Sequence, residues 1–219
     1  HHEVTMDNVK KSITSRTKVI SLAYITNVIG DIRPMREIID YAHQKGILVV
    51  GDGAQSMSHL KMNVTLDDID FFVASAHKMY GPTGVGFLYG KFDLLNEMDP
   101  TSYGGGMNAM YLKDGYVELR EVPTKFEAGT QNIAGVIGMG KAISYLENIG
   151  MNKIMKHEHE LKNYLVSKLK EFDNIIIYNE VTMFTKTFSS LLKHNVFITD
   201  SMEILNKITN NEIYKNMIL

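Results

Sequence analysis

The chain has 219 residues, 44% of them hydrophobic and 22% charged, which suits one large globular domain or one domain and part of another. Its net charge of −2 and its scattered lysines argue against a nucleic-acid-binding surface. The chain contains no cysteine, which excludes a disulfide scaffold or a thiolate metal site within it. No apolar run reaches the roughly 18 residues of a membrane span, and the first residues lack the pattern of a signal or transit peptide.

Short apolar runs alternate with amphipathic segments in the first part of the chain. A helix is predicted over residues 34–46, because Pro34 suits a helix start, apolar residues follow at helical spacing and Gly46 ends the pattern. The order of strand, helix and strand predicts a right-handed crossover in a largely parallel sheet, and the lack of polar alternation predicts strands covered on both faces. Buried strands are predicted at residues 18–24, 47–50, 70–75 and 84–90.

The pattern changes in the second half of the chain. Residues 99–132 are rich in glycine and predict a long connection of the kind that is often functional or mobile. Two helices are predicted at 133–148 and 151–172, with a domain boundary inside the second. Beyond them the pattern predicts strands at 174–178, 181–188 and 196–198 and helices at 189–195 and 201–208.

Polar residues follow two of the predicted strands directly, where ligands bind in open α/β sheets. Asp52 stands between two glycines after the second strand, although a carboxylate there also suits the cap of a following helix. Ser75 is the last residue of the third strand, and His77 and Lys78 follow it. A desolvated lysine at such a place can attack carbonyl groups, although a surface lysine and a core histidine are the simpler interpretations of each residue alone.

Two further segments complete the pattern. Glycines at 81, 84 and 86 permit a tight return into the fourth strand, which alone is weak evidence for a phosphate site. Thr130 follows Phe126-Glu127-Ala128-Gly129 and precedes a predicted helix, where its hydroxyl suits either an anion or a plain helix cap.

Together and in this order the motifs DGAQS, SAHKMYGPTGVG and FEAGT resemble the class V aminotransferase-like enzymes that use pyridoxal 5'-phosphate (PLP), and within them the SufS-type cysteine desulfurases. The resemblance extends from residue 3 to about residue 172 and includes ITNVIGDIRPMREIIDYAHQKG. It implies an α/β fold, the PLP-dependent transferase fold type I, with a mostly parallel central sheet between helices. Residues 1–150 would form the central part of the large PLP-binding domain, 151–172 a connecting helix and 173–219 part of a small α+β C-terminal domain.

The resemblance also assigns roles. Lys78 would form the Schiff base with PLP, and Asp52 would bond the pyridine nitrogen and keep the ring an electron sink. Gln55 would contact the phenolic oxygen of the ring. The remaining residues with an implied role are Ser75 and His77 at the cofactor phosphate, Asn27 near the substrate carboxylate and the ring, and Thr130 at the phosphate of a partner subunit.

The family reaction converts L-cysteine to L-alanine and passes persulfide sulfur to an acceptor protein of the SufE or SufU kind for iron–sulfur cluster assembly. The implied assembly is a homodimer with a shared active site, with no nucleic acid, membrane or metal. It would work in the cytoplasm of a bacterium or in a plastid-type organelle (the apicoplast) of a parasite.

This sequence departs from the family pattern in its second half. The family uses a sulfur-accepting cysteine and an arginine for the substrate carboxylate, and none of the arginines at 16, 33, 36 and 120 matches the latter. The chain is therefore expected to be part of a longer enzyme and to turn over no cysteine alone. The alternatives are another class V enzyme, such as a selenocysteine lyase, and a non-catalytic paralogue that serves as a scaffold.

Overall fold

The computed structural model describes residues 4–28, 30–111, 113, 115 and 117–169. The chain divides into two compact units, residues 1–155 and 156–219; the last helix in the chain order below crosses from the first unit into the second, and the other features belong to the first. Short 3₁₀ turns, η1 (Ser56–Ser58), η2 (Ala76–Lys78) and η3 (Thr124–Phe126), join longer elements. In chain order these are α1 (Met6–Ser12), β1 (Val19–Ala23), α2 (Met35–His43), β2 (Leu48–Asp52), α3 (Val64–Asp67), β3 (Phe71–Ser75), β4 (Gly86–Gly90), α4 (Phe92–Glu97), β5 (Asn108–Tyr111), β6 (Val117–Leu119), α5 (Ile133–Ile149) and α6 (Met151–Leu169).

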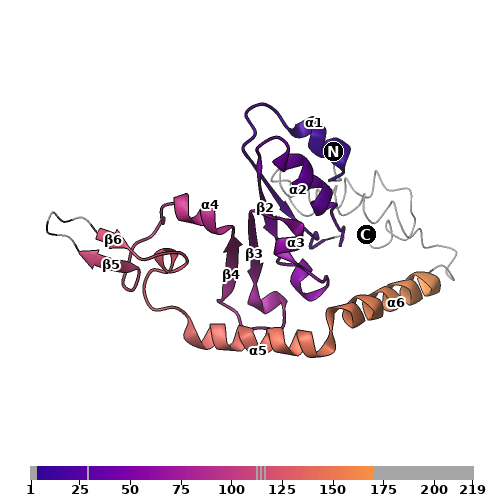
Figure 1. Ribbon diagram of the computed structural model, residues 1–219. Coiled ribbons are helices and arrows are strands. Elements are labelled where there is room, and N and C mark those ends of the chain that lie inside the picture. The colour runs from indigo at the N-terminus through magenta and orange to yellow at the C-terminus, as the bar shows by residue number, and fades with distance from the viewer. Residues whose placement is uncertain (1–3, 29, 112, 114, 116, 170–219) are drawn as a thin grey trace, which may run out of the picture. The chain divides into compact units, whose positions relative to one another are not determined.

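The main sheet has the strand order β1-β2-β3-β4 (Figure 1). The first three strands are parallel, with Ala23 opposite Asp52 and Asp52 opposite Val73, so their carboxyl ends reach the same edge. This confirms the predicted α/β class with a mostly parallel sheet. β4 is antiparallel and pairs Gly86 with Ser75, which brings the start of β4 to the edge where β3 ends.

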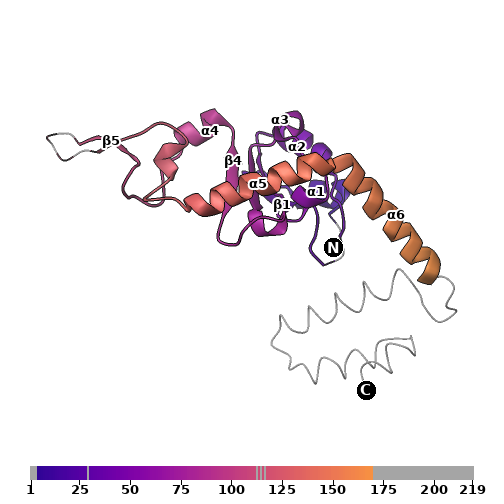
Figure 2. The ribbon, with the colours of Figure 1, turned by 90° about the horizontal axis from the view of Figure 1, so that it is seen from below.

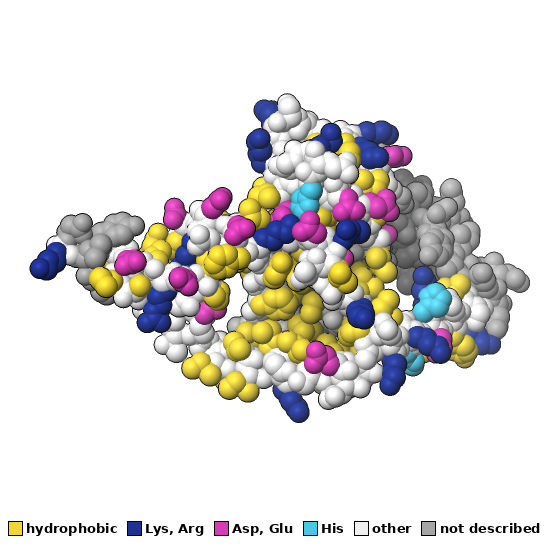
Figure 3. All heavy atoms as spheres, in the orientation of Figure 1, with side chains coloured by type: hydrophobic (Ala, Val, Ile, Leu, Met, Phe, Trp, Pro, Cys, Tyr) yellow, Lys and Arg dark blue, Asp and Glu magenta, His cyan; other side chains and the backbone are white. Residues whose placement is uncertain are grey.

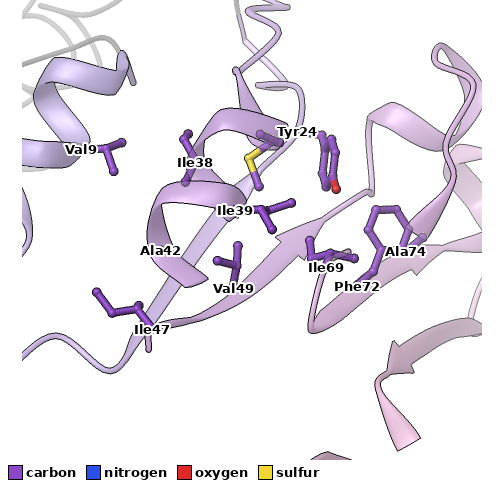
Figure 4. Packing of buried hydrophobic residues seen from close by; sticks show 11 residues of the cluster. Val9, Tyr24, Ile38, Ile39, Ala42, Ile47, Val49, Ile69, Phe72 and Ala74 are labelled. Carbon is purple, nitrogen blue, oxygen red and sulfur yellow. The ribbon is translucent and has the colours of Figure 1, made fainter. Parts of the chain in front are cut away.

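The core lies between α2 and one face of this sheet. Ile38, Ile39 and Ala42 are completely buried, and Figure 4 labels them together with the strand residues Val49 and Phe72 of the same buried cluster. Their spacing is the one recognised in the sequence, and burying each isoleucine contributes about 1.5–3 kcal/mol. The helix therefore holds β1 and β2 in the register that aligns their carboxyl ends.

Two expectations from the sequence are wrong. The strands are not covered on both faces within the described part: residues of β2 and β3 alternate between buried and half-buried, and those of β1 and β4 between half-buried and exposed. The segment 99–132, expected as one long connection, contains an antiparallel pair of strands, β5 and β6. These strands are too short to leave a clear alternation in the sequence. The elements expected at 174–208 lie outside the described residues.

A charged cluster closes the amino edge of the sheet. The Asp70 carboxylate is 4% exposed and lies 2.8 Å from His43 Nε2 and 2.9 Å from Lys91 Nζ, and it accepts the Val49 N–H at 2.7 Å. Asp68 forms the outer part, 2.7 Å from Lys91 Nζ and 3.3 Å from His43 Nδ1. The cluster therefore ties α2, β2, β3 and the end of β4 together.

The cluster shifts the titration of its members. Burial raises the pKa of Asp70, but the hydrogen bonds from His43, Val49 and Lys91 together outweigh it, so the pKa lies below its ordinary value. Burial lowers the pKa of Lys91, but the two carboxylates outweigh that effect and the pKa is raised. Both charged forms are thus favoured by the fold.

Candidate cofactor site

Asp52 ends β2 at the carboxyl edge of the sheet and is exposed. Its Oδ1 accepts the N–H of Ala54 at 2.8 Å, a local bond that orients the carboxylate. The following turn η1 has Gln55 at its N-cap position and no side-chain cap, so Asp52 is not the cap of a helix. Within the described residues Asp52 forms no ion pair, and its second oxygen is available to a cationic ring nitrogen.

Glycine is required beside this carboxylate. A Cβ placed on Gly53 would lie 1.9 Å from Phe72 Cζ, inside the van der Waals radius of the ring. The Gly53 N–H donates to the Val73 carbonyl at 2.7 Å, so the backbone continues along β3 for one residue beyond β2. This close packing fixes the position of Asp52 relative to β3.

Lys78 ends the η2 turn that directly follows β3. The turn is anchored on both sides: the Ala76 N–H donates to the Val85 carbonyl at 3.0 Å, and Met79, 1% exposed, fills the interior beneath it. The Gly81 N–H returns to the Ala76 carbonyl at 2.9 Å, where a Cβ on Gly81 would collide with the same oxygen. Lys78 itself is exposed and forms no ion pair with any described residue, so it occupies a surface position and not the desolvated one considered from the sequence.

The other predicted residues lie along the same edge. Ser75 is the half-buried last residue of β3, and His77 is exposed, which rules out its interpretation as a core histidine. Gln55 is half-buried at the start of η1, one turn after Asp52. Asn27 is exposed in the loop that follows β1.

Helix α5 runs across this edge, past the end of β3 and the start of β4 (Figure 1 and Figure 2). Its N-cap is Asn132, which accepts the Gly135 N–H at 3.0 Å and donates to the Gly84 carbonyl at 3.3 Å. Tyr145 contacts Tyr80 edge-on, with ring centroids 6.0 Å apart. The helix therefore supports the turn that carries Lys78.

Thr130 is exposed and lies before α5 without capping it, because the cap is Asn132. A cavity of about 440 Å³ separates the helix start from the glycine segment before β4; its lining residues are Gly84, Val85, Gly86, Glu127, Gln131, Asn132, Ile133, Val136 and Ile137. The cavity flanks the Lys78 turn and does not enclose Lys78 or Asp52.

The sequence interpretation missed Asn132 and Tyr145. The capping role of Asn132 could have been predicted from the sequence, since asparagine is a preferred N-cap residue before an apolar helical segment. Tyr145 carried none, because only the path of α5 across the sheet edge brings it to Tyr80.

The groups present fit PLP. A free amine on Lys78 and a free carboxylate on Asp52 stand at the ends of neighbouring parallel strands, where ligands bind in such sheets. Ser75, His77 and Gln55 add a hydroxyl, an imidazole and an amide at the same edge. This donor set matches an aldehyde cofactor that carries a ring nitrogen and a phosphate.

Comparison with known proteins identifies the family of this chain. The family model described as "Aminotransferase class-V" matches residues 1–211. The chain belongs to that family. A probable cysteine desulfurase of Halalkalibacterium halodurans is 44% identical over 80% of this chain and 43% of its own length.

Solved structures agree as well. A cysteine desulfurase of Escherichia coli matches with TM-score 0.64 and 41% identity over 67% of this chain and 37% of its own. The apo structure of a cysteine desulfurase from Thermococcus onnurineus matches with TM-score 0.70 and 36% identity, over 75% of this chain and 41% of its own. The fold of this chain is therefore the α/β fold of these enzymes, and the chain spans about two fifths of the length of the curated relative named above.

Among the helices described over residues 4–169, none is both long and apolar enough to cross a membrane.

Proposed function

We propose that the protein to which this chain belongs is a PLP-dependent cysteine desulfurase of the SufS type. The observation that carries the proposal is the placement of Lys78 and Asp52 at the ends of neighbouring strands, in a chain 44% identical to a probable cysteine desulfurase. PLP, when bound, supplies the electron sink for bond cleavage in the substrate. The protein would release L-alanine from L-cysteine and pass the sulfur on for iron–sulfur cluster assembly.

Each residue of the candidate cofactor site would have a role that follows from its position. Lys78 would bind the cofactor covalently and then move a proton at the substrate α-carbon, since it is the exposed, unpaired amine on a rigid turn. Asp52 would hold the proton of the ring nitrogen, and Gln55 would bond the phenolic oxygen. Ser75 and His77 would hold the phosphate.

Two residues would complete the site from farther away. Asn27 would orient the substrate carboxylate from the loop after β1. Thr130 would reach the phosphate of a second subunit in a homodimer, which accords with its exposed position beside the sheet edge. A sulfur acceptor of the SufE or SufU kind would collect the product sulfur, in the bacterial cytoplasm or in an apicoplast.

Borohydride reduction followed by peptide mass analysis tests the cofactor site. The full-length protein loaded with PLP should carry the reduced cofactor on Lys78, and Lys78→Ala should abolish this attachment. Lys141→Ala on α5 is the matched control and should leave the attachment unchanged. Attachment at another lysine, or its persistence in Lys78→Ala, would show that the proposed site is wrong.

The reaction is tested separately. Full-length protein should release equal amounts of alanine and sulfur from L-cysteine in the presence of a reductant, whereas the 219-residue chain alone, which has no cysteine, should release none. Release from selenocysteine only would favour a selenocysteine lyase. Cofactor binding without turnover of either substrate would favour a scaffold, the second function that the absence of cysteine supports.

A further inference from the structure

A basic cavity lies at the edge of the sheet opposite the candidate cofactor site. It measures about 570 Å³ and is lined by Lys10, Ile13, Thr14, Ser15, Thr17, Lys18, Tyr41, Lys45 and Ile47. Lys18 directly precedes β1 and Ile47 directly precedes β2, so the cavity is separated from Asp52 by the length of a five-residue strand, about 16 Å. Nothing in the proposed reaction uses it.

Three lysine side chains line this cavity. Within the described residues Lys10, Lys18 and Lys45 form no ion pair, and no Asp or Glu lines the cavity. Lys10 and Lys45 instead lie over the Tyr41 ring, with Nζ 5.5 and 5.0 Å from its centroid. Figure 3 shows Lys and Arg side chains gathered around α1 and the loop after it. Charges of one sign held together on a concave surface attract an anion.

The loop after α1 adds hydroxyl donors. Thr17 Oγ1 accepts the Thr14 N–H at 3.0 Å, and Thr14 Oγ1 accepts the Arg16 N–H at 3.3 Å. The two hydroxyls lie 3.5 Å apart, so at most one can donate to the other. Each hydroxyl carries one O–H donor, so at least one O–H remains to donate to a ligand.

We propose that this cavity binds a small phosphate-bearing anion. Three positive charges match the two or more negative charges of a phosphate or pyrophosphate group better than the single charge of a carboxylate. Tyr41 offers no free stacking platform for a base, since lysine ammonium groups occupy its surroundings, and the chain has a net charge of −2, so a nucleic acid fits poorly. The ligand class is thus a compact phosphate compound.

Lysine footprinting tests the site in the full-length protein saturated with PLP, so that the cofactor phosphate site is filled. Acylation is followed by peptide mass analysis with and without pyrophosphate at low ionic strength. Lys10 and Lys45 should be protected, while Lys141 and the neighbouring Lys11, which does not line the cavity, should react as before. Uniform protection, or none at millimolar pyrophosphate, would overturn the proposal.

Variants locate the interaction independently. By calorimetry Lys45→Gln should weaken pyrophosphate binding by roughly tenfold, the loss of one charged hydrogen bond, and Lys11→Gln should not change it. Thr14→Val should weaken binding and Thr14→Ser should restore it. Equal losses of pyrophosphate affinity in Lys11→Gln and Lys45→Gln would show that binding comes from general electrostatic attraction, and this would refute the proposed site. Inorganic phosphate and a sugar phosphate, run in parallel, distinguish the free ion from a phosphorylated metabolite.

Discussion

Replacing Asp70 tests how the fold holds the edge of the sheet opposite the candidate cofactor site. Asp70→Ala removes the contacts to His43, Lys91 and the Val49 N–H and leaves that buried donor without a partner. Removing one member of a buried pair costs about 3–5 kcal/mol; the lower end is expected because Lys91 is 32% exposed and keeps Asp68. Asp70→Asn retains an oxygen for Val49 and should cost about 2 kcal/mol.

The same residue predicts a pH dependence. The folded-state pKa of Asp70 is lowered, so its stabilisation is complete above the unfolded pKa of about 3.9 and is lost as the pH falls through the folded value. The pKa of Lys91 is raised, so its contribution is complete below about 10.4 and is lost as the pH rises through the folded value. The free energy of unfolding should therefore be greatest between these two pH limits. Asp70→Asn should weaken the fall of this free energy at acidic pH.

Urea unfolding across this pH range measures both effects, and hydrogen exchange at the Val49 amide reports the local bond. Asp40→Asn is the control, because Asp40 pairs with Arg36 at 3.3 Å on an exposed helix face and should contribute at most about 0.5 kcal/mol. The prediction is wrong if the Asp70 and Asp40 variants unfold at the same urea concentration. It is also wrong if the free energy of unfolding of Asp70→Asn falls at acidic pH as steeply as that of the wild type.

Two further substitutions test the site geometry. Gly53→Ala should destabilise the protein by about 1–3 kcal/mol and weaken PLP binding, because the added methyl group displaces Phe72 beside Asp52. Urea unfolding measures the stability and cofactor titration measures the binding. Gly105→Ala is the control: the space around Gly105 is open, so neither stability nor PLP binding should change. Asn132→Ala should lower stability by about 0.5–2 kcal/mol through loss of the α5 cap, as measured by urea unfolding. Asn132→Asp keeps the capping oxygen and loses only the bond to the Gly84 carbonyl, so it should lower stability less; equal losses would contradict the capping role.

Local pattern alone determined much of the framework. The strands around 18–24, 47–50 and 70–75 and the helix over 34–46 were predictable because buried faces impose periodicity on neighbouring residues. The positions of Asp52 and Lys78 at strand ends followed from the same pattern, since each stands directly after an apolar run. Short elements such as α3 and β6 left too few residues for a period to be recognised.

Tertiary structure alone decided what depends on distant residues. The antiparallel direction of β4 has no signature in its own five residues, because alternation is the same in both directions, yet it brings Gly86 to Ser75. The cluster around Asp70 joins residues 21 and 27 positions away. Lysines that are scattered in the sequence line one cavity only because the α1 end, the β1 start and the turn after α2 meet at the amino edge of the sheet. Periodicity records which face of an element is buried, but contact between elements is a property of the folded chain.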